Sequence, residues 1–192
     1  RWITSPLVRA VETARLLGAV DPPHDHRLAE MDWGAWGGME LDFVAYVDFS
    51  AELARGCAST GWTVGNLLIH HWMLALYDER AQDEVWSKNP DAVIASGIAY
   101  PQGKARRVDG GFVIGGFWNF SSGVDHADWN MLAVTVRDGE RVVDHRMCLV
   151  PKGDYDIVDD WHVLGMRSTG SKSVKVAELF VPEHRALCMY LA

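Results

Sequence analysis

The feature that most constrains the fold is a change of period at Asn89-Pro90-Asp91, a turn signal in its own right. Before it, apolar residues recur every three or four positions, the spacing of an amphipathic helix. After it, short runs rich in β-branched and aromatic residues alternate with Gly and Asp turns, as strands do. The sequence therefore predicts an α+β chain: a helical segment followed by an antiparallel β-sandwich or barrel.

The helical segment divides into three predicted helices. They span Phe43 to Gly65, Asn66 to Leu76 and Asp78 to Trp86. Gly56 and Gly61 weaken the first, because glycine disfavours a helix interior. Asp78 suits the N-cap of the third helix.

The segment after Pro90 predicts strands separated by turn residues. The predicted strands span Ala92–Tyr100, Lys104–Val108, Phe112–Phe120, Asn130–Val136, Arg141–Val150, Tyr155–Trp161 and Ser173–Val181. Asp109-Gly110-Gly111 and Asp138-Gly139 each predict a β-hairpin, because Asp-Gly suits tight turns with positive φ.

Composition narrows the classes of partner. The 192 residues carry a net charge of -8, which disfavours nucleic-acid phosphates and anionic membrane surfaces. Cys57, Cys148 and Cys188 are odd in number and widely spaced, as free thiols in a reducing compartment would be. With no apolar run of membrane-spanning length, the expectation is a cytoplasmic protein.

Residues 1–38 differ from the rest. The segments 4–14 (TSPLVRAVETA) and 28–38 (LAEMDWGAWGG) resemble motifs of the histidine phosphatase (phosphoglycerate mutase-like) superfamily. The resemblance makes Arg9 a phosphate-pocket arginine and Glu30 an acid/base carboxylate. The Arg-His-Gly nucleophile motif of that family is not in this sequence, so we interpret residues 1–38 as a remnant. A phosphohydrolase based on these residues stays an alternative.

The stretch Gly115 to Trp129 combines flat apolar side chains with short hydroxyls. Such a combination suits a planar heteroaromatic ring, which needs a stacking face and polar groups at its edge. The alternative is a strand end whose aromatics are core and whose serines form a turn. The cluster Asp125-His126-Ala127-Asp128 has too few ligands for a metal site and is interpreted as a polar loop.

Several motifs in order over residues 50 to 187 resemble the acyl-CoA dehydrogenase fold, within it the two-component flavin-dependent aromatic monooxygenases. The motifs are Ala58-Ser59-Thr60-Gly61-Trp62, His70-His71-Trp72, Ile94-Ala95-Ser96-Gly97, Trp118 to Gly123 with Asp125 to Trp129, Leu164 to Lys172, and Val181-Pro182-Glu183-His184-Arg185. The stretches Ser96 to Gly103 and Phe120 to Gly123 depart from the acyl-CoA dehydrogenase motifs, which favours the oxygenase branch.

This resemblance implies an oxidoreductase that uses reduced FAD or FMN and O2 to hydroxylate a phenolic or other aromatic substrate. It also implies a separate NAD(P)H flavin reductase and a homo-oligomer in the full-length family. An acyl-CoA dehydrogenase-type reaction on CH-CH donors and a non-catalytic fusion fragment remain alternatives.

The resemblance assigns roles to residues of this chain. Cofactor-binding residues would be Ser96, Trp118, Phe120, Ser121 and Ser122, with Ser121 the first choice for a catalytic hydroxyl near flavin N5 and Ser122 as its substitute. Core packing and turn formation are the alternatives for these side chains.

Substrate-binding residues would be Trp62, His70, Arg167 and Thr169. His70 would also be catalytic, binding a phenol oxygen, unless it is a core histidine. Arg167, Thr169 and the nearby Ser171 lie in a Gly-bounded loop that a plain turn also explains.

The resemblance divides the chain into a phosphatase-like remnant (1–38), a helical segment (39–90), a middle β domain (91–186) and the truncated start of a C-terminal domain (187–192). The C-terminal helical bundle of the family is expected to be absent. We therefore expect weak or no activity and reduced flavin affinity in the chain as given.

Overall fold

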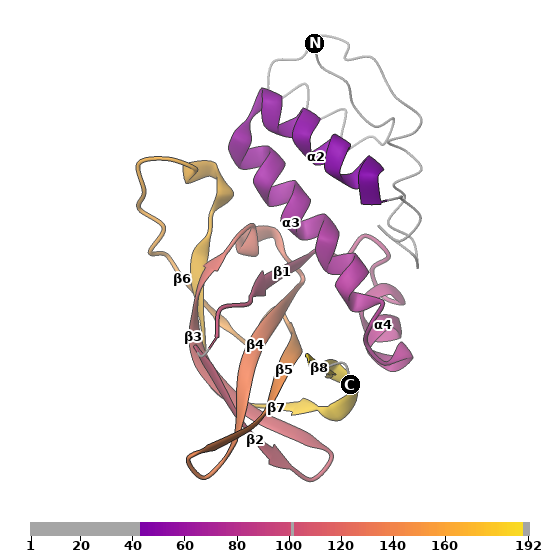
Figure 1. Ribbon diagram of the computed structural model, residues 1–192, viewed down its shortest axis with the longest axis vertical. Helices are drawn as coiled ribbons and strands as arrows, with labels where there is room; N and C mark the ends of the chain where they lie inside the picture. The colour runs from indigo at the N-terminus through magenta and orange to yellow at the C-terminus, as the bar shows by residue number, and fades with distance from the viewer. Residues whose placement is uncertain (1–42, 101, 190–192) are drawn as a thin grey trace.

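The computed structural model describes residues 43–100 and 102–189, within which three α-helices precede eight strands (Figure 1). The helices are α2 (Phe43–Gly56), α3 (Ala58–Leu74) and α4 (Glu79–Trp86). The strands are β1 (Ile94–Gly97), β2 (Gly103–Val108), β3 (Gly111–Ser121), β4 (Trp129–Asp138), β5 (Arg141–Pro151), β6 (Asp156–Val158), β7 (Lys172–Pro182) and β8 (Ala186–Cys188). The predicted α+β order is confirmed, whereas the predicted remnant with Arg9 and Glu30 lies outside the described residues.

Helices α2 and α3 form an antiparallel pair whose break differs from the prediction. The break falls at Cys57, whose backbone is extended, and α3 continues through Gly61 and Gly65. A Cβ at Gly61 would lie 2.6 Å from the Cβ of Ala54 on α2. The predicted boundary at Gly65 was therefore wrong: these glycines allow two helices to approach closely, and their low helix propensity is overridden by that packing.

The sheet is mixed. Its strand order is β6-β7-β3-β2-β4-β5-β8, and β1 pairs with β4 outside that path. Most neighbours are antiparallel, but β4 runs parallel to both β1 and β2. The prediction of a purely antiparallel arrangement was wrong, because period-two alternation places residues on faces without specifying the direction of the neighbouring strand.

Both predicted hairpins are confirmed. Gly110 (φ 75°) turns β2 into β3, and Gly139 (φ 58°) turns β4 into β5. Strand β8, which pairs with β5, was not predicted, because three residues carry little periodicity. Together the two hairpins form the end of the sheet farthest from α2 and α3 (Figure 1).

Two groups of buried residues lie on opposite sides of β1 and β4. One surrounds Trp118 and includes Ala95 of β1 and Leu132 of β4. The other lies under α4 and includes Ile94 of β1 and Met131 of β4. Because side chains alternate along a strand, Ser96 lies on the same side of β1 as Ile94. None of the helices in the described ranges is long and apolar enough to cross a membrane.

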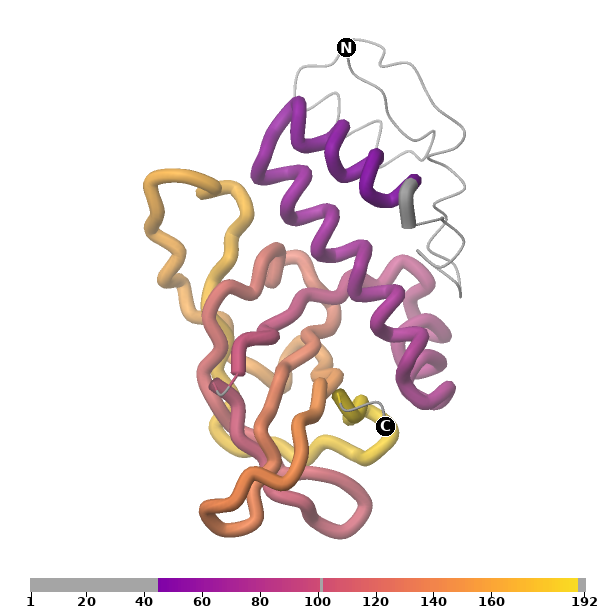
Figure 2. Tube along the Cα trace, in the orientation of Figure 1, coloured from indigo at the N-terminus to yellow at the C-terminus, as the bar shows by residue number. Residues whose placement is uncertain are grey.

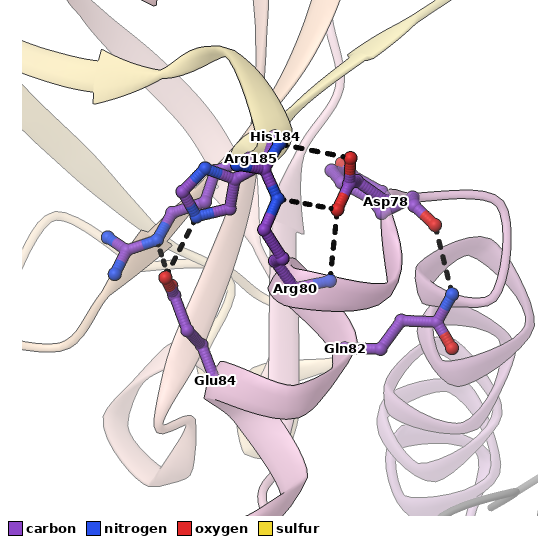
Figure 3. A network of polar contacts seen from close by, with 7 residues as sticks. Asp78, Arg80, Gln82, Glu84, His184 and Arg185 are labelled. Carbon is purple, nitrogen blue, oxygen red and sulfur yellow. Dashed lines mark hydrogen bonds and ion pairs between the residues drawn. The ribbon is translucent and has the colours of Figure 1, made fainter.

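A polar network joins α4 to the turn between β7 and β8 (Figure 3). Glu84 of α4 accepts a hydrogen bond from Nε2 of His184 at 2.8 Å and forms an ion pair with Arg185. Partial burial raises the pKa of the Glu84 carboxyl, but the hydrogen bonds and charges of His184 and Arg185 together outweigh it and leave the pKa lowered. At the start of α4, Asp78 caps the helix as predicted, accepting from the backbone N–H of Arg80.

The network makes a testable contribution to stability. Glu84→Gln is expected to lower the free energy of unfolding by about 1–2 kcal/mol, because it removes a partly buried charge with two partners. Asp83→Asn is the matched control, since it removes an exposed charge from the same helix. Urea denaturation measures both, and equal stabilities for the two variants would contradict a role for the network.

Candidate functional site

A row of side-chain hydrogen bonds marks the place where α3 meets the turn after β3. Nε1 of Trp62 donates to Oγ of Ser122 at 3.0 Å. Ser122 Oγ lies 2.8 Å from Ser171 Oγ, which lies 2.6 Å from Oγ1 of Thr169. Thr169 in turn donates to the carbonyl oxygen of Met166 at 2.9 Å. We call these residues the hydroxyl row: Trp62, Ser122, Ser171, Thr169 and the Met166 carbonyl.

Backbone geometry brings three separate segments together at this row. Gly123, with a φ of 74°, begins a turn of 3-10 helix, and a Cβ there would lie 2.9 Å from Cγ2 of Thr63 on α3. Its N–H donates to the carbonyl of Thr169 at 2.9 Å. The loop between β6 and β7 stands beside the N-terminal half of α3 (Figure 2), where Ser59 contacts the sulfur of Met166.

Aromatic side chains border the row and face solvent. Trp62 is 55% exposed and Phe120 is 64% exposed. Phe120 has a φ of 67°, an uncommon conformation for a residue other than glycine, and its ring meets Trp161 edge to face at 6.0 Å. Backbone positions of this kind cluster at functional sites, which makes Phe120 a candidate binding residue. The described residues thus offer aromatic faces beside a polar edge.

The structure separates the two serines that the sequence placed together. Ser121 is fully buried, and its Oγ accepts a hydrogen bond from Asn130 of β4 at 2.9 Å. Ser122 belongs to the row beneath Trp62 and is 8% exposed. Both hydroxyls are buried, but Ser122 lies in the turn after β3 and contacts the exposed Trp62, whereas Ser121, the last residue of β3, contacts Asn130. The geometry favours Ser122 over Ser121, which was our first choice.

Trp118 is enclosed by the protein itself. Its side chain is fully buried, and Nε1 donates to the carbonyl of Ala133 at 2.7 Å. A Cβ at Gly97 or Gly103 would lie within 2.7 Å of the Trp118 side chain, so both glycines make room for the ring. The alternative of core packing therefore accounts for Trp118 better than direct stacking on a cofactor.

His70 of α3 contacts the backbone of β1, the strand that also carries Ser96. Nδ1 of His70 is 2.8 Å from the carbonyl oxygen of Ile94, two residues before Ser96. Since a carbonyl only accepts, Nδ1 carries the proton, and Nε2 of the neutral ring is left as an acceptor. The hydroxyl of Ser96 makes no hydrogen bond to the described residues and is at the limit of burial. Both side chains are thus polar groups with little exposure to solvent.

Burial keeps the histidine pair of α3 neutral. Desolvation lowers the pKa of His70 to about 4, against a smaller opposing effect of the Ile94 carbonyl. Desolvation, and then repulsion by His70, lower the pKa of His71 to about 4. The ring of His71 stacks on Trp86 with centroids 6.1 Å apart, so it packs toward α4. His70 contacts the backbone of β1.

A cavity of about 270 Å³ adjoins the row on the side of the β6–β7 loop. Its lining includes Arg167, Thr169 and Trp161. Arg167 is exposed and has no carboxylate partner among the described residues, whereas Thr169 is buried in the row. The structure therefore brings Trp62 and Thr169 together in the hydroxyl row. It places Arg167 in the wall of the adjoining cavity.

The acidic cluster after Gly123 has structural partners, in keeping with a polar loop. Asp128 accepts from the backbone N–H of Val93 at 2.9 Å. Asp125 pairs with Lys172 at 3.1 Å, which joins the turn to the start of β7.

Two residues of the site had no signal in the sequence. Asn130 holds Ser121, and Trp161 packs against Phe120. Both lie in runs that read as ordinary strand, so only the three-dimensional pairing reveals their roles. Ser171 was noted with its loop, but its contact with Ser122, 49 positions away, cannot be deduced from spacing.

Comparisons with known proteins define a class. The chain's homologues are oxygenase components of flavin-dependent monooxygenases, and its neighbours among solved structures are monooxygenases of acyl-CoA dehydrogenase-like fold. In addition, residues 1–54 match the histidine phosphatase superfamily (branch 1). Most of that match lies outside the described residues.

Particular relatives are close in sequence and structure. The oxygenase subunit HsaA of a flavin-dependent monooxygenase from Mycobacterium tuberculosis is 43% identical over 152 residues, which cover 79% of this chain and 38% of HsaA. The oxygenase component of the FADH(2)-dependent resorcinol hydroxylase from Rhizobium sp. is 40% identical over 156 residues, 80% of this chain and 37% of the relative. The chain therefore spans less than half the length of these relatives.

Solved structures give the same picture. The HsaA monooxygenase of M. tuberculosis superposes with a TM-score of 0.78 at 40% identity, over 84% of this chain and 44% of HsaA. XiaF from Streptomyces sp., solved with FADH2 and glycerol, superposes with a TM-score of 0.77 at 32% identity, over 95% of this chain and 43% of XiaF.

The buried histidines predict how stability depends on pH. In the unfolded chain the two histidines bind protons below about pH 6.5, whereas in the folded chain they stay neutral down to about pH 4. Stability is therefore full above pH 6.5 and falls on acidification, by about 2 kcal/mol per histidine between pH 7 and pH 5.

Urea denaturation between pH 5 and pH 7 checks this expectation. His70→Gln removes one titrating group and should reduce the loss by about half, even if it lowers stability at pH 7. His162→Gln, at an exposed position, is the control and should leave the loss unchanged. A wild-type stability that is constant over this range would contradict the neutral burial of the pair.

Proposed function

We propose that this chain is part of the oxygenase component of a flavin-dependent monooxygenase that hydroxylates a phenolic or related aromatic substrate. The observation that carries the proposal is the hydroxyl row bordered by exposed aromatic rings, at the junction of α3 and β3. The class of the homologues points to the same chemistry. Because the named relatives are monooxygenases, oxygenation is favoured over acyl-CoA dehydrogenation.

The residues present fit the edge of a flavin ring. A flavin is a flat heteroaromatic system with polar atoms along one edge, so it needs an apolar face and small polar groups together. Phe120 and Trp62 supply the face, and Ser122 supplies the polar contact. When bound, reduced FAD or FMN supplies the electrons with which O2 is activated.

The buried side of α3 suits the aromatic substrate. The neutral His70 presents Nε2 as an acceptor, which can bind the hydroxyl of a phenol. Ser96 of β1 offers a hydroxyl. The low exposure of both side chains limits the access of water, which protects reactive oxygen chemistry from side reactions.

Arg167 suits an anionic group. Its guanidinium lies at the open side of the row, in the wall of the 270 Å³ cavity, without a carboxylate partner among the described residues. A phosphate or carboxylate of a bound molecule would complete its hydrogen bonding. We assign it to the phosphate-bearing part of the cofactor or to an acidic substrate.

The proposal also assigns partners. Relatives named as oxygenase components act with a second component, and we assign to this chain a separate NAD(P)H flavin reductase that supplies the reduced cofactor. The homo-oligomer and the division into domains at residues 38, 90 and 186 remain predictions.

Flavin binding tests the proposal. Anaerobic fluorescence titration with reduced FMN and FAD is expected to show saturable binding, and Ser122→Ala should weaken it about tenfold by removing a buried hydrogen bond. Ser121→Ala should mainly lower the free energy of unfolding, because Ser121 faces Asn130.

Ser87→Ala provides the control, since Ser87 is exposed at the end of α4. Saturable binding that Ser122→Ala leaves unchanged would place the flavin elsewhere. The absence of binding at any attainable concentration would refute the cofactor assignment for this chain.

A further inference from the structure

We propose that Ser171 and Thr169 are positioning residues that fix the direction of the Ser122 hydroxyl, so that Ser122 offers a lone pair rather than a proton to a bound molecule. The direction of the row follows from the described contacts alone. Its consequence for the cofactor rests on the proposed function, and the two are tested separately below.

The direction is set at the Met166 end of the row. The Met166 carbonyl accepts from Oγ1 of Thr169 at 2.9 Å, from the N–H of Thr169 at 3.1 Å and from Nε1 of Trp161 at 3.2 Å. Because a carbonyl oxygen only accepts, we assign the single hydroxyl proton of Thr169 to this contact, the shortest of the three. The contact of 2.6 Å between Thr169 and Ser171 must then be made with the proton of Ser171. Ser171 therefore donates and Thr169 accepts.

The same reasoning continues to the helix. Because the proton of Ser171 is committed to Thr169, the contact of 2.8 Å between Ser122 and Ser171 uses the proton of Ser122. The indole N–H of Trp62 is a donor only and adds a second hydrogen bond to Ser122. Ser122 thus donates once and accepts once, and its remaining capacity is one lone pair.

Burial makes this direction persistent. Thr169 is 2% exposed and Ser171 is 5% exposed, so water does not readily replace either partner. Hydrogen bonds of uniform direction strengthen one another in such surroundings. The Met166 end is held by two backbone positions of positive φ, Met166 at 57° and Gly170 at 51°.

An acceptor at this position distinguishes the two redox states of a flavin. Reduced flavin carries a proton on N5 and can donate it to Ser122, whereas N5 of oxidised flavin has only a lone pair. A lone pair opposite a lone pair is repulsive, so the row favours the reduced cofactor. Ser171→Ala would release the proton of Ser122, which could then turn toward oxidised N5.

The first test needs no ligand. The indole N–H resonance of Trp62 in ¹H–¹⁵N NMR spectra reports on its acceptor, Ser122. Ser122→Ala should shift this resonance upfield and speed its exchange with solvent. Ser171→Ala should cause a smaller shift in the same direction, and Ser171→Thr, which keeps a hydroxyl, should restore the resonance.

Ser87→Ala is the control for the NMR test, and Thr169→Val replaces Ser171→Ala if the latter does not fold. Thr169→Val keeps the shape of the side chain and removes the oxygen that accepts from Ser171. If the Trp62 resonance does not move in these variants, as it should not in Ser87→Ala, the hydrogen bonds of the hydroxyl row are contradicted. This outcome does not depend on whether flavin binds.

The second test measures the direction through redox preference. The ratio of dissociation constants for oxidised and reduced FMN is expected to fall about fivefold to tenfold in Ser171→Ala, the effect of one hydrogen bond. An unchanged ratio would mean that Ser122 already presents its proton, which overturns the direction. If neither redox state binds, the proposed function fails, and the NMR test alone decides whether the row exists.

Discussion

The hydrogen bond from Trp62 to Ser122 joins the helical part of the chain to the end of β3. It requires α3 to lie directly over the turn at Gly123, where any larger residue would meet Thr63. The same turn is held from the other side by the N–H of Gly123 on Thr169. The position of the site therefore depends on one close approach between α3 and the turn at Gly123. Apolar packing alone would not fix this position, because it is not directional.

Two kinds of surroundings meet along α3. Trp62 and Phe120 expose aromatic surface beside the row, while His70 lies in the apolar interior with its Nδ1 proton committed to Ile94. Trp62 and His70 are eight residues apart, about 12 Å along a helix axis. The proposed function assigns the first position to the cofactor and the second to the substrate.

Sequence alone predicts the order of helices and strands, both Asp-Gly hairpins and the Asp78 cap, because each depends on local chemistry. Sequence alone does not predict features that depend on contacts between residues far apart in the chain. The helix break moved to Cys57 because Gly61 packs on Ala54, and the parallel pairing of β4 has no local signature. The choice between Ser121 and Ser122 likewise depends on Asn130 and Ser171, whose positions only the folded chain defines. The resemblance points to the stretch as a whole and does not distinguish Ser121 from Ser122.

The most direct test of the account is to map where reduced flavin changes the spectrum of the folded protein. Anaerobic titration of ¹⁵N-labelled protein with reduced FMN should perturb Trp62, Phe120, Ser122 and Trp161. Signals of Tyr77 and Cys188, which line a separate cavity beside α4, should not move. Perturbation confined to that second cavity, with Trp62 and Ser122 unchanged, would contradict the assignment of the hydroxyl row as the flavin edge site.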